Sequence, residues 1–185
     1  MSDSPRSLQE IDISVAEPYH QELSEEWLRM VMEAVLVEAL PQSEPSQVGL
    51  VITDDATVQE LNRQFRGLDE VTDVLSFSAS HSGHWAGEVQ ETEEEDINSE
   101  DTGAFPFALP PGEPSPLGEV IISFPQTQRQ AQERNCPVEQ ELALLIVHGV
   151  LHLVGYDHVG PEDEAGMQAK ERSALAVVSR LEAGI

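Results

Sequence analysis

Residues 141–158 read ELALLIVHGVLHLVGYDH and contain the strongest structural signal of the chain. The apolar residues of this stretch fall on nearly every side of a helix, a pattern typical of a helix buried at the centre of a domain. Pro137 precedes the stretch and suits the start of a helix, whereas Gly155 suits a turn that follows one. We therefore predict a central helix that begins at Pro137 and ends before Gly155.

Three of the six histidines of the chain, His148, His152 and His158, lie in this stretch. His148 and His152 are four residues apart, so on a helix they share one face and lie about 6 Å apart along the axis. Gly155 can adopt the positive φ of a chain reversal, which would bring His158 back toward the other two. Three neutral nitrogen ligands suit Zn²⁺ and leave a fourth position for water. We therefore predict one zinc ion per chain, bound by these three histidines.

The spacing of the histidines is also that of the metzincin peptidases. Those enzymes carry a glutamate directly after the first histidine as the general base, whereas this chain carries Gly149. Glycine has no side chain that can accept a proton from water, so the peptidase base is missing. Asp157, beside the third histidine, has two open interpretations: it orients a histidine or moves protons, or it caps the turn.

The hydrophobic pattern outside this stretch predicts an α+β fold, a small mixed sheet of about four strands packed with about five helices. The metal-binding histidines would lie on and after the central helix, in a zincin-like site. Strands are expected within residues 11–15, 48–53, 73–78 and 117–123. Helices are expected after the capping residue Ser24, from about Asp55, and from Pro125, Pro137 and Pro161.

Length and composition narrow the class of protein. The 185 residues suggest a single domain spanning 1–185. A single cysteine excludes an internal disulfide framework, and the longest apolar run, six residues, is too short for a membrane helix. No secretory signal is visible at the N-terminus. We therefore expect an acidic cytoplasmic protein with no membrane partner.

Two segments are expected to lie outside the packed domain. Residues 79–116 separate two predicted strands and contain nine acidic residues, five prolines and no lysine or arginine. Such a composition predicts a flexible acidic insertion. Residues 1–10 are predicted to form a disordered tail.

A second motif, LNRQFRGLDEVTDVLSFS, occupies residues 61–78 and contains Arg63 and Arg66. Arg66 stands at an expected helix end, just before Gly67, where a guanidinium complements the helix dipole. The same side chain can instead present its planar, two-pronged group to a phosphate. The residues alone leave both roles open.

The chain resembles the YbeY family of bacterial endoribonucleases. The motifs at 148–158 and 61–78 carry the resemblance together with LGEVIIS at 117–123. It implies a zinc site of His148, His152 and His158, with Arg66 as the functional arginine beside the metal. It also implies roles in ribosomal RNA maturation, including the 3′ end of small-subunit RNA, and in ribosome quality control.

Four features depart from the family pattern. Val71 and Ser78 stand where the family usually has proline, and Glu119 stands where it has aspartate. The first two affect loop stiffness, and Glu119 keeps the charge. The insertion 79–116 is longer than the connection of the family, which bears on substrate access and partner choice.

We therefore predict a zinc-dependent, single-strand-specific endoribonuclease of ribosomal RNA processing, with Arg66 and Asp157 as catalytic residues. Its expected partners are single-stranded or ribosomal RNA and the ribosome or ribosome-associated proteins, and no DNA is expected. One alternative is a peptidase of metzincin-like geometry. Another is a non-enzymatic ribosome-assembly factor with a structural metal, in which Asp157 would close the fourth position.

The net charge of −26 argues against broad RNA affinity, because phosphate binding normally rests on Lys and Arg. Two explanations would reconcile this charge with an RNA substrate. Arg63, Arg66, Arg129 and Arg134 line one cleft, or the ribosome or a protein partner presents the RNA. The sequence does not choose between them.

Overall fold

A computed structural model describes residues 9–41, 45–79, 113–156 and 161–184 of the chain. Within these ranges, β1 (Gln9–Val15), β2 (Ser46–Thr53), β3 (Val74–Ser78) and β4 (Ser115–Ser123) form one sheet in the order β1-β2-β4-β3. β1, β2 and β4 run parallel, and β3 pairs antiparallel with β4 at one edge. The mixed four-stranded sheet predicted from the sequence is thus confirmed.

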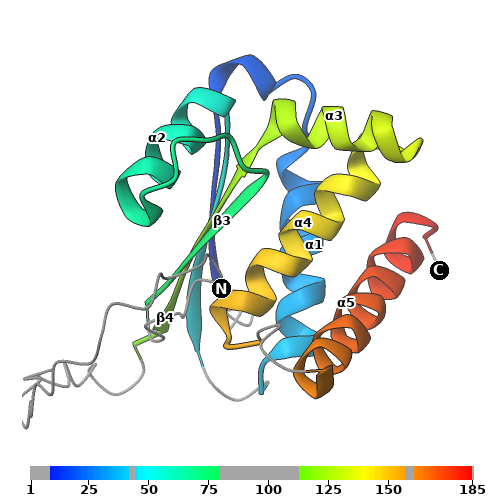
Figure 1. Cartoon of the computed structure of the whole chain (residues 1–185). Coiled ribbons are helices and arrows are strands. Elements are labelled where there is room, and N and C mark those ends of the chain that lie inside the picture. Colours follow the sequence, from blue (N-terminus) through cyan, green and yellow to red (C-terminus); the bar gives the residue numbers. More distant parts are fainter. Residues whose placement is uncertain (1–8, 42–44, 80–112, 157–160, 185) are drawn as a thin grey trace, which may run out of the picture.

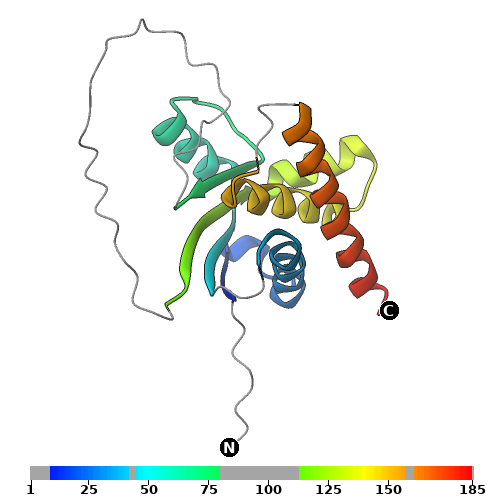
Figure 2. The same cartoon turned by 90° about the horizontal axis from the view of Figure 1, so that it is seen from below.

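Helices cover both faces of this sheet (Figures 1 and 2). They are α1 (Glu25–Ala39), α2 (Asp55–Arg66), α3 (Phe124–Arg134), α4 (Val138–Leu153) and α5 (Pro161–Glu182), with a short 3-10 turn, η1 (Glu17–Tyr19). α1 and α4 pack on one face and α5 packs outside them, whereas α2 packs on the other face. Within the described ranges, no helix has both the length and the apolar character that crossing a membrane requires.

The helices begin and end at the residues whose chemistry suits those positions. The Ser24 side chain accepts a hydrogen bond from the backbone N–H of Trp27, and the Asp54 side chain accepts one from Thr57. Each bond satisfies a backbone donor that the first helical turn leaves unpaired. Gly67 ends α2 with φ of 71°, a left-handed conformation that glycine adopts without steric cost.

Two predicted boundaries are corrected by strand pairing. β1 begins at Gln9 and β4 at Ser115, so two residues of the predicted tail and two of the predicted insertion belong to the sheet. Gln9 and Ser115 both pair with Ser46 on β2, which fixes their backbone where no apolar alternation marks a strand. Most of the rest of these two segments, residues 1–8 and 80–112, lies outside the described residues.

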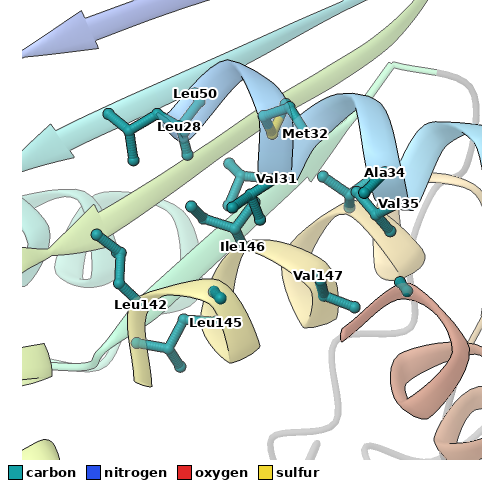
Figure 3. Close-up of a cluster of buried hydrophobic side chains, with 14 of the residues drawn as sticks. Leu28, Val31, Met32, Ala34, Val35, Leu50, Leu142, Leu145, Ile146 and Val147 are labelled. Carbon is teal, nitrogen blue, oxygen red and sulfur yellow. The ribbon is translucent and has the colours of Figure 1, made fainter. Parts of the chain in front are cut away.

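The core forms where α1 and α4 pack against each other on the same face of the sheet (Figure 3). Ten of the 16 residues of α4 are buried, so α4 is the central buried helix that its sequence predicts. Val31 of α1 lies beside Ile146 of α4, and both side chains are fully buried. Full burial of one such side chain contributes about 1.5–3 kcal/mol, so this contact is a major source of stability.

Gly149 allows α4 to lie unusually close to the sheet. A Cβ atom at this position would fall 2.6 Å from Cγ1 of Val120 on β4 and 3.2 Å from Oγ of Ser76 on β3. The Ser76 hydroxyl donates a 3.1 Å hydrogen bond to the carbonyl oxygen of Gly149. The missing side chain at 149 is therefore a packing requirement of the sheet.

We predict that Gly149→Ala destabilises the protein by about 1–2 kcal/mol, because overpacking costs more than the helix propensity of alanine returns. Gly166→Ala is the matched control, since Gly166 also lies in a helix but a Cβ there meets nothing within 4 Å. That variant should be neutral or up to about 1 kcal/mol more stable. Urea denaturation measures both, and equal behaviour of the two variants would contradict the packing argument.

Candidate metal centre at the end of helix α4

His148 and His152 lie in the last two turns of α4 and are both half-buried. Their Nε2 atoms are 3.1 Å apart, and the ring planes cross at 77°. Two nitrogens bonded to one tetrahedral zinc ion lie roughly 3.3 Å apart, because each Zn–N bond is about 2.0–2.1 Å. The two imidazoles therefore converge at a separation that suits binding of one metal ion.

Glu171 of α5 contacts the far side of the His148 ring. Its Oε1 atom lies 2.8 Å from Nδ1 of His148, and the Glu171 side chain is only 16% exposed. An ionised carboxylate accepts and cannot donate, so Nδ1 carries the proton in this contact. The lone pair of a neutral His148 is then on Nε2, the atom that faces His152.

The sequence analysis missed Glu171, although a signal for it exists. Met167, Ala174 and Val178 are buried at helical spacing on α5, and Glu171 falls on the same stripe. A carboxylate on the apolar stripe of a helix needs a polar partner, because burying it alone is costly. That position therefore indicated a partner on a neighbouring helix.

The chain reverses directly after His152, as predicted. Gly155 has φ of 93°. The N–H of Gly155 donates to the carbonyl oxygen of His152, and the N–H of Tyr156 donates to the carbonyl oxygen of Leu151. Each donor–acceptor distance is 3.1 Å. This pair of bonds is the Schellman ending of a helix.

The third predicted ligand, His158, and the predicted catalytic residue Asp157 lie outside the described residues. Both roles therefore stay predictions. Within the described part of the chain, no three or more His, Cys, Asp or Glu side chains come together as a metal-binding group. The described geometry thus supplies two converging imidazoles and one carboxylate behind the ring of His148.

The position that holds the catalytic glutamate in metzincin peptidases points into the sheet in this protein. Gly149 contacts Val120 and Ser76, so a glutamate side chain at 149 would meet packed atoms. The geometry therefore agrees with the sequence that this peptidase base is missing.

Arg66 is the last residue of α2 and is half-buried. α2 and α4 contact β3 from opposite faces. On one face, the rings of Phe65 and Phe77 lie 5.1 Å apart. On the other face, the Ser78 hydroxyl donates to the carbonyl oxygen of Leu153. The edge strand β3 therefore separates the helix of Arg66 from the histidine helix, and both proposed roles of Arg66 stay open.

The hypothesis of one cleft lined by arginines stays a prediction, and Arg63, Arg129 and Arg134 each bind a carboxylate. Arg63 pairs with Glu60 at 2.6 Å, Arg129 with Asp55 at 2.9 Å, and Arg134 with the buried Glu141 at 2.7 Å. The hydrogen bond from Arg129 lowers the pKa of Asp55 below its ordinary value, so this pair stays ionised at neutral pH. These local pairs satisfy side chains that a basic cleft would need to leave available for phosphate.

Comparison with known proteins identifies the family. The model of the family described as "Endoribonuclease YbeY" matches residues 10–179. The chain belongs to this family. The resemblance inferred from the three motifs is therefore confirmed.

Relatives and a solved structure resemble this YbeY-family chain over nearly its whole length. Endoribonuclease YbeY from Roseiflexus sp. (strain RS-1) is 39% identical over 95% of this chain and 94% of its own. That of Dehalococcoides mccartyi (strain CBDB1) is 39% identical over 90% and 91%. The solution structure of TM1509 from Thermotoga maritima is 26% identical, with a TM-score of 0.53, and covers 91% of this chain and 88% of that chain. The family match therefore includes both the sheet and the histidine helix.

Proposed function

We propose that this chain is an endoribonuclease of ribosomal RNA processing that uses a metal ion bound at the end of α4. The observation that carries the proposal is the convergence of the Nε2 atoms of His148 and His152 at 3.1 Å. That convergence occurs in a member of a family whose relatives are named endoribonucleases. The convergence of the two nitrogens supports a metal site. The family membership supports RNA as the substrate.

The donor set fits zinc, one ion per chain. His148 and His152 offer neutral imidazole nitrogens, and His158, which follows the observed reversal at Gly155, would supply the third. Neutral imidazoles are preferred ligands of Zn²⁺. When bound, zinc supplies a Lewis acid that lowers the pKa of a water molecule and polarises a phosphoryl oxygen.

The other predicted residues would act on the RNA and on protons. Arg66 would bind the scissile phosphate with its planar guanidinium and neutralise charge there. Asp157, next to His158, would orient that histidine or accept and return a proton. Gly149 provides no base, so the site favours RNA over a peptide substrate.

The substrate would be single-stranded ribosomal RNA, including the 3′ end of small-subunit RNA, in maturation and in ribosome quality control. Since three described arginines already bind carboxylates, the protein has few side chains available for phosphate. We therefore favour presentation of the RNA by the ribosome or a ribosome-associated protein. This role places the protein in the cytoplasm and requires neither DNA nor a membrane.

We predict that the purified full chain carries about one zinc per molecule and cleaves unstructured RNA but not unfolded peptides. His152→Ala should lose most of the zinc and the cleavage, because it removes one of the two converging ligands. His20→Ala is the control, since His20 is an exposed histidine on η1's C-terminal side. Metal analysis and gel assays of RNA cleavage measure these effects.

Two results would favour one of the alternative functions over the endoribonuclease. Chelator-sensitive peptide cleavage without RNA cleavage would favour the peptidase. Full zinc occupancy without either activity, on RNA alone and on RNA in ribosomal subunits, would favour an assembly factor with a structural metal.

We predict that Arg66→Ala leaves the fold and zinc content near those of the wild type but lowers RNA cleavage by about 10²-fold, the typical effect of removing one charge-stabilising donor. Arg66→Lys should restore activity only in part, because a point charge does not reproduce the two-pronged contact. Arg63→Ala, which removes an arginine paired with Glu60 in the same turn of α2, is the control. If Arg66→Ala instead lowers the stability of the protein, and the loss of activity is no larger than the loss of folded protein, Arg66 merely complements the helix dipole.

A further inference from the structure

We infer that Glu171 is a positioning residue of the metal centre, one that holds His148 in the tautomer whose Nε2 is available to a metal ion. The inference makes α5 a functional part of the site, although α5 carries none of the predicted ligands. It rests on the proposed metal binding by His148 and His152 and does not depend on RNA as substrate.

The chemistry of the contact indicates which ring nitrogen carries the proton, because an ionised carboxylate can only accept. Oε1 of Glu171 lies 2.8 Å from Nδ1 of His148, a short distance typical of a charge-assisted hydrogen bond. Nδ1 therefore donates, and the lone pair of the neutral ring is placed on Nε2. This nitrogen lies 3.1 Å from Nε2 of His152, on the side of the ring opposite Glu171.

The placement of Glu171 is not explained by the packing of α5. Its side chain is 16% exposed and lies on the helix stripe that buries Met167 and Ala174. An apolar residue would pack there at lower desolvation cost, so the carboxylate needs a polar partner to offset its burial. His148 is that partner.

Other contacts already attach α5 to the rest of the protein. The ammonium of Lys170 donates a 2.7 Å bond to the carbonyl oxygen of Glu38 on α1. The indole N–H of Trp27, also on α1, donates a 2.7 Å bond to Glu182 near the end of α5. These two bonds hold the middle and the end of α5 to α1, so the Glu171–His148 contact is not the only polar contact that docks the helix.

The chemical consequence concerns the affinity of the histidines for metal. A carboxylate that accepts from the second ring nitrogen of a ligating histidine fixes the ring orientation and raises the basicity of the ligand. Loss of such a carboxylate typically weakens metal binding 10–100-fold. Glu171 should therefore act on metal affinity through His148, without touching metal or RNA.

The test measures zinc affinity of the full-length protein by competition with a chromogenic chelator. Glu171→Ala should weaken zinc binding about 10–100-fold. Glu171→Gln should weaken it less, because the amide oxygen still accepts from Nδ1 although its charge is gone. Glu164→Ala is the matched control, since Glu164 is an exposed glutamate of the same helix that contacts Gln168.

A second readout is the tautomer of His148 in the metal-free protein, measured by ¹⁵N NMR at a pH where imidazole is neutral. The wild type and Glu171→Gln should carry the proton on Nδ1, whereas Glu171→Ala should shift it toward a mixture of both tautomers. A purely structural clamp would lower stability in Glu171→Ala without moving zinc affinity or the ¹⁵N signature.

Three outcomes would overturn the inference. The first is folded Glu171→Ala that binds zinc as tightly as the wild type. The second is metal-free wild type with the proton of His148 on Nε2, a result that decides the question even if Glu171→Ala fails to fold. The third is wild type that binds no zinc, which overturns the proposed metal site and this inference with it, whereas loss of RNA cleavage alone would leave both standing.

Discussion

The close approach of α4 to the sheet at Gly149 is the constraint on which the site depends. The helix lies near enough to β3 and β4 that a Cβ at 149 would meet Val120 at 2.6 Å. Successive residues of a helix are turned by about 100°, so His148 and His152 face roughly 60–100° away from the line of contact. Both side chains are therefore neither buried in the contact with the sheet nor fully exposed to solvent. From this half-buried position, two imidazoles can bind a metal ion together.

The same close approach of α4 to the sheet sets this protein apart from a peptidase with similar histidine spacing. The position after the first histidine is used for packing, so no base can be placed there. The polar support comes from the opposite direction, through Glu171 on α5. The site thus combines a rigid inner side, set by backbone packing, with a carboxylate on the outer side that orients one ring.

Much of the fold could be predicted because the signals are local. Each signal is read from residues that are close together in the sequence. They are the apolar residues on most sides of α4, the capping side chains of Ser24 and Asp54, and the glycine turn after His152. The strand order could not be predicted, since alternation marks a strand without naming its neighbour. β4 lies between β2 and β3, and nothing in the sequence of either neighbour specifies this pairing.

Of the candidate site, the helix placement of two histidines was predictable from a local signal, and the roles of the site residues stay predictions. The i, i+4 histidines could be placed on one face from the helix period alone. Glu171 and the ion pairs of the arginines depend on contacts between distant elements, and an acidic residue in a chain of net charge −26 does not stand out by type. Only the packing of α5 on α4 brings Glu171 to His148.

The most direct measurement is anomalous diffraction at the zinc absorption edge from crystals of the full-length protein grown with zinc. We expect one zinc peak within bonding distance of Nε2 of both His148 and His152, with the carboxylate of Glu171 still on Nδ1 of His148. A zinc ion bound through Nδ1 of either ring would contradict it. Zinc bound only elsewhere, with the two Nε2 atoms still in direct contact, would contradict it equally.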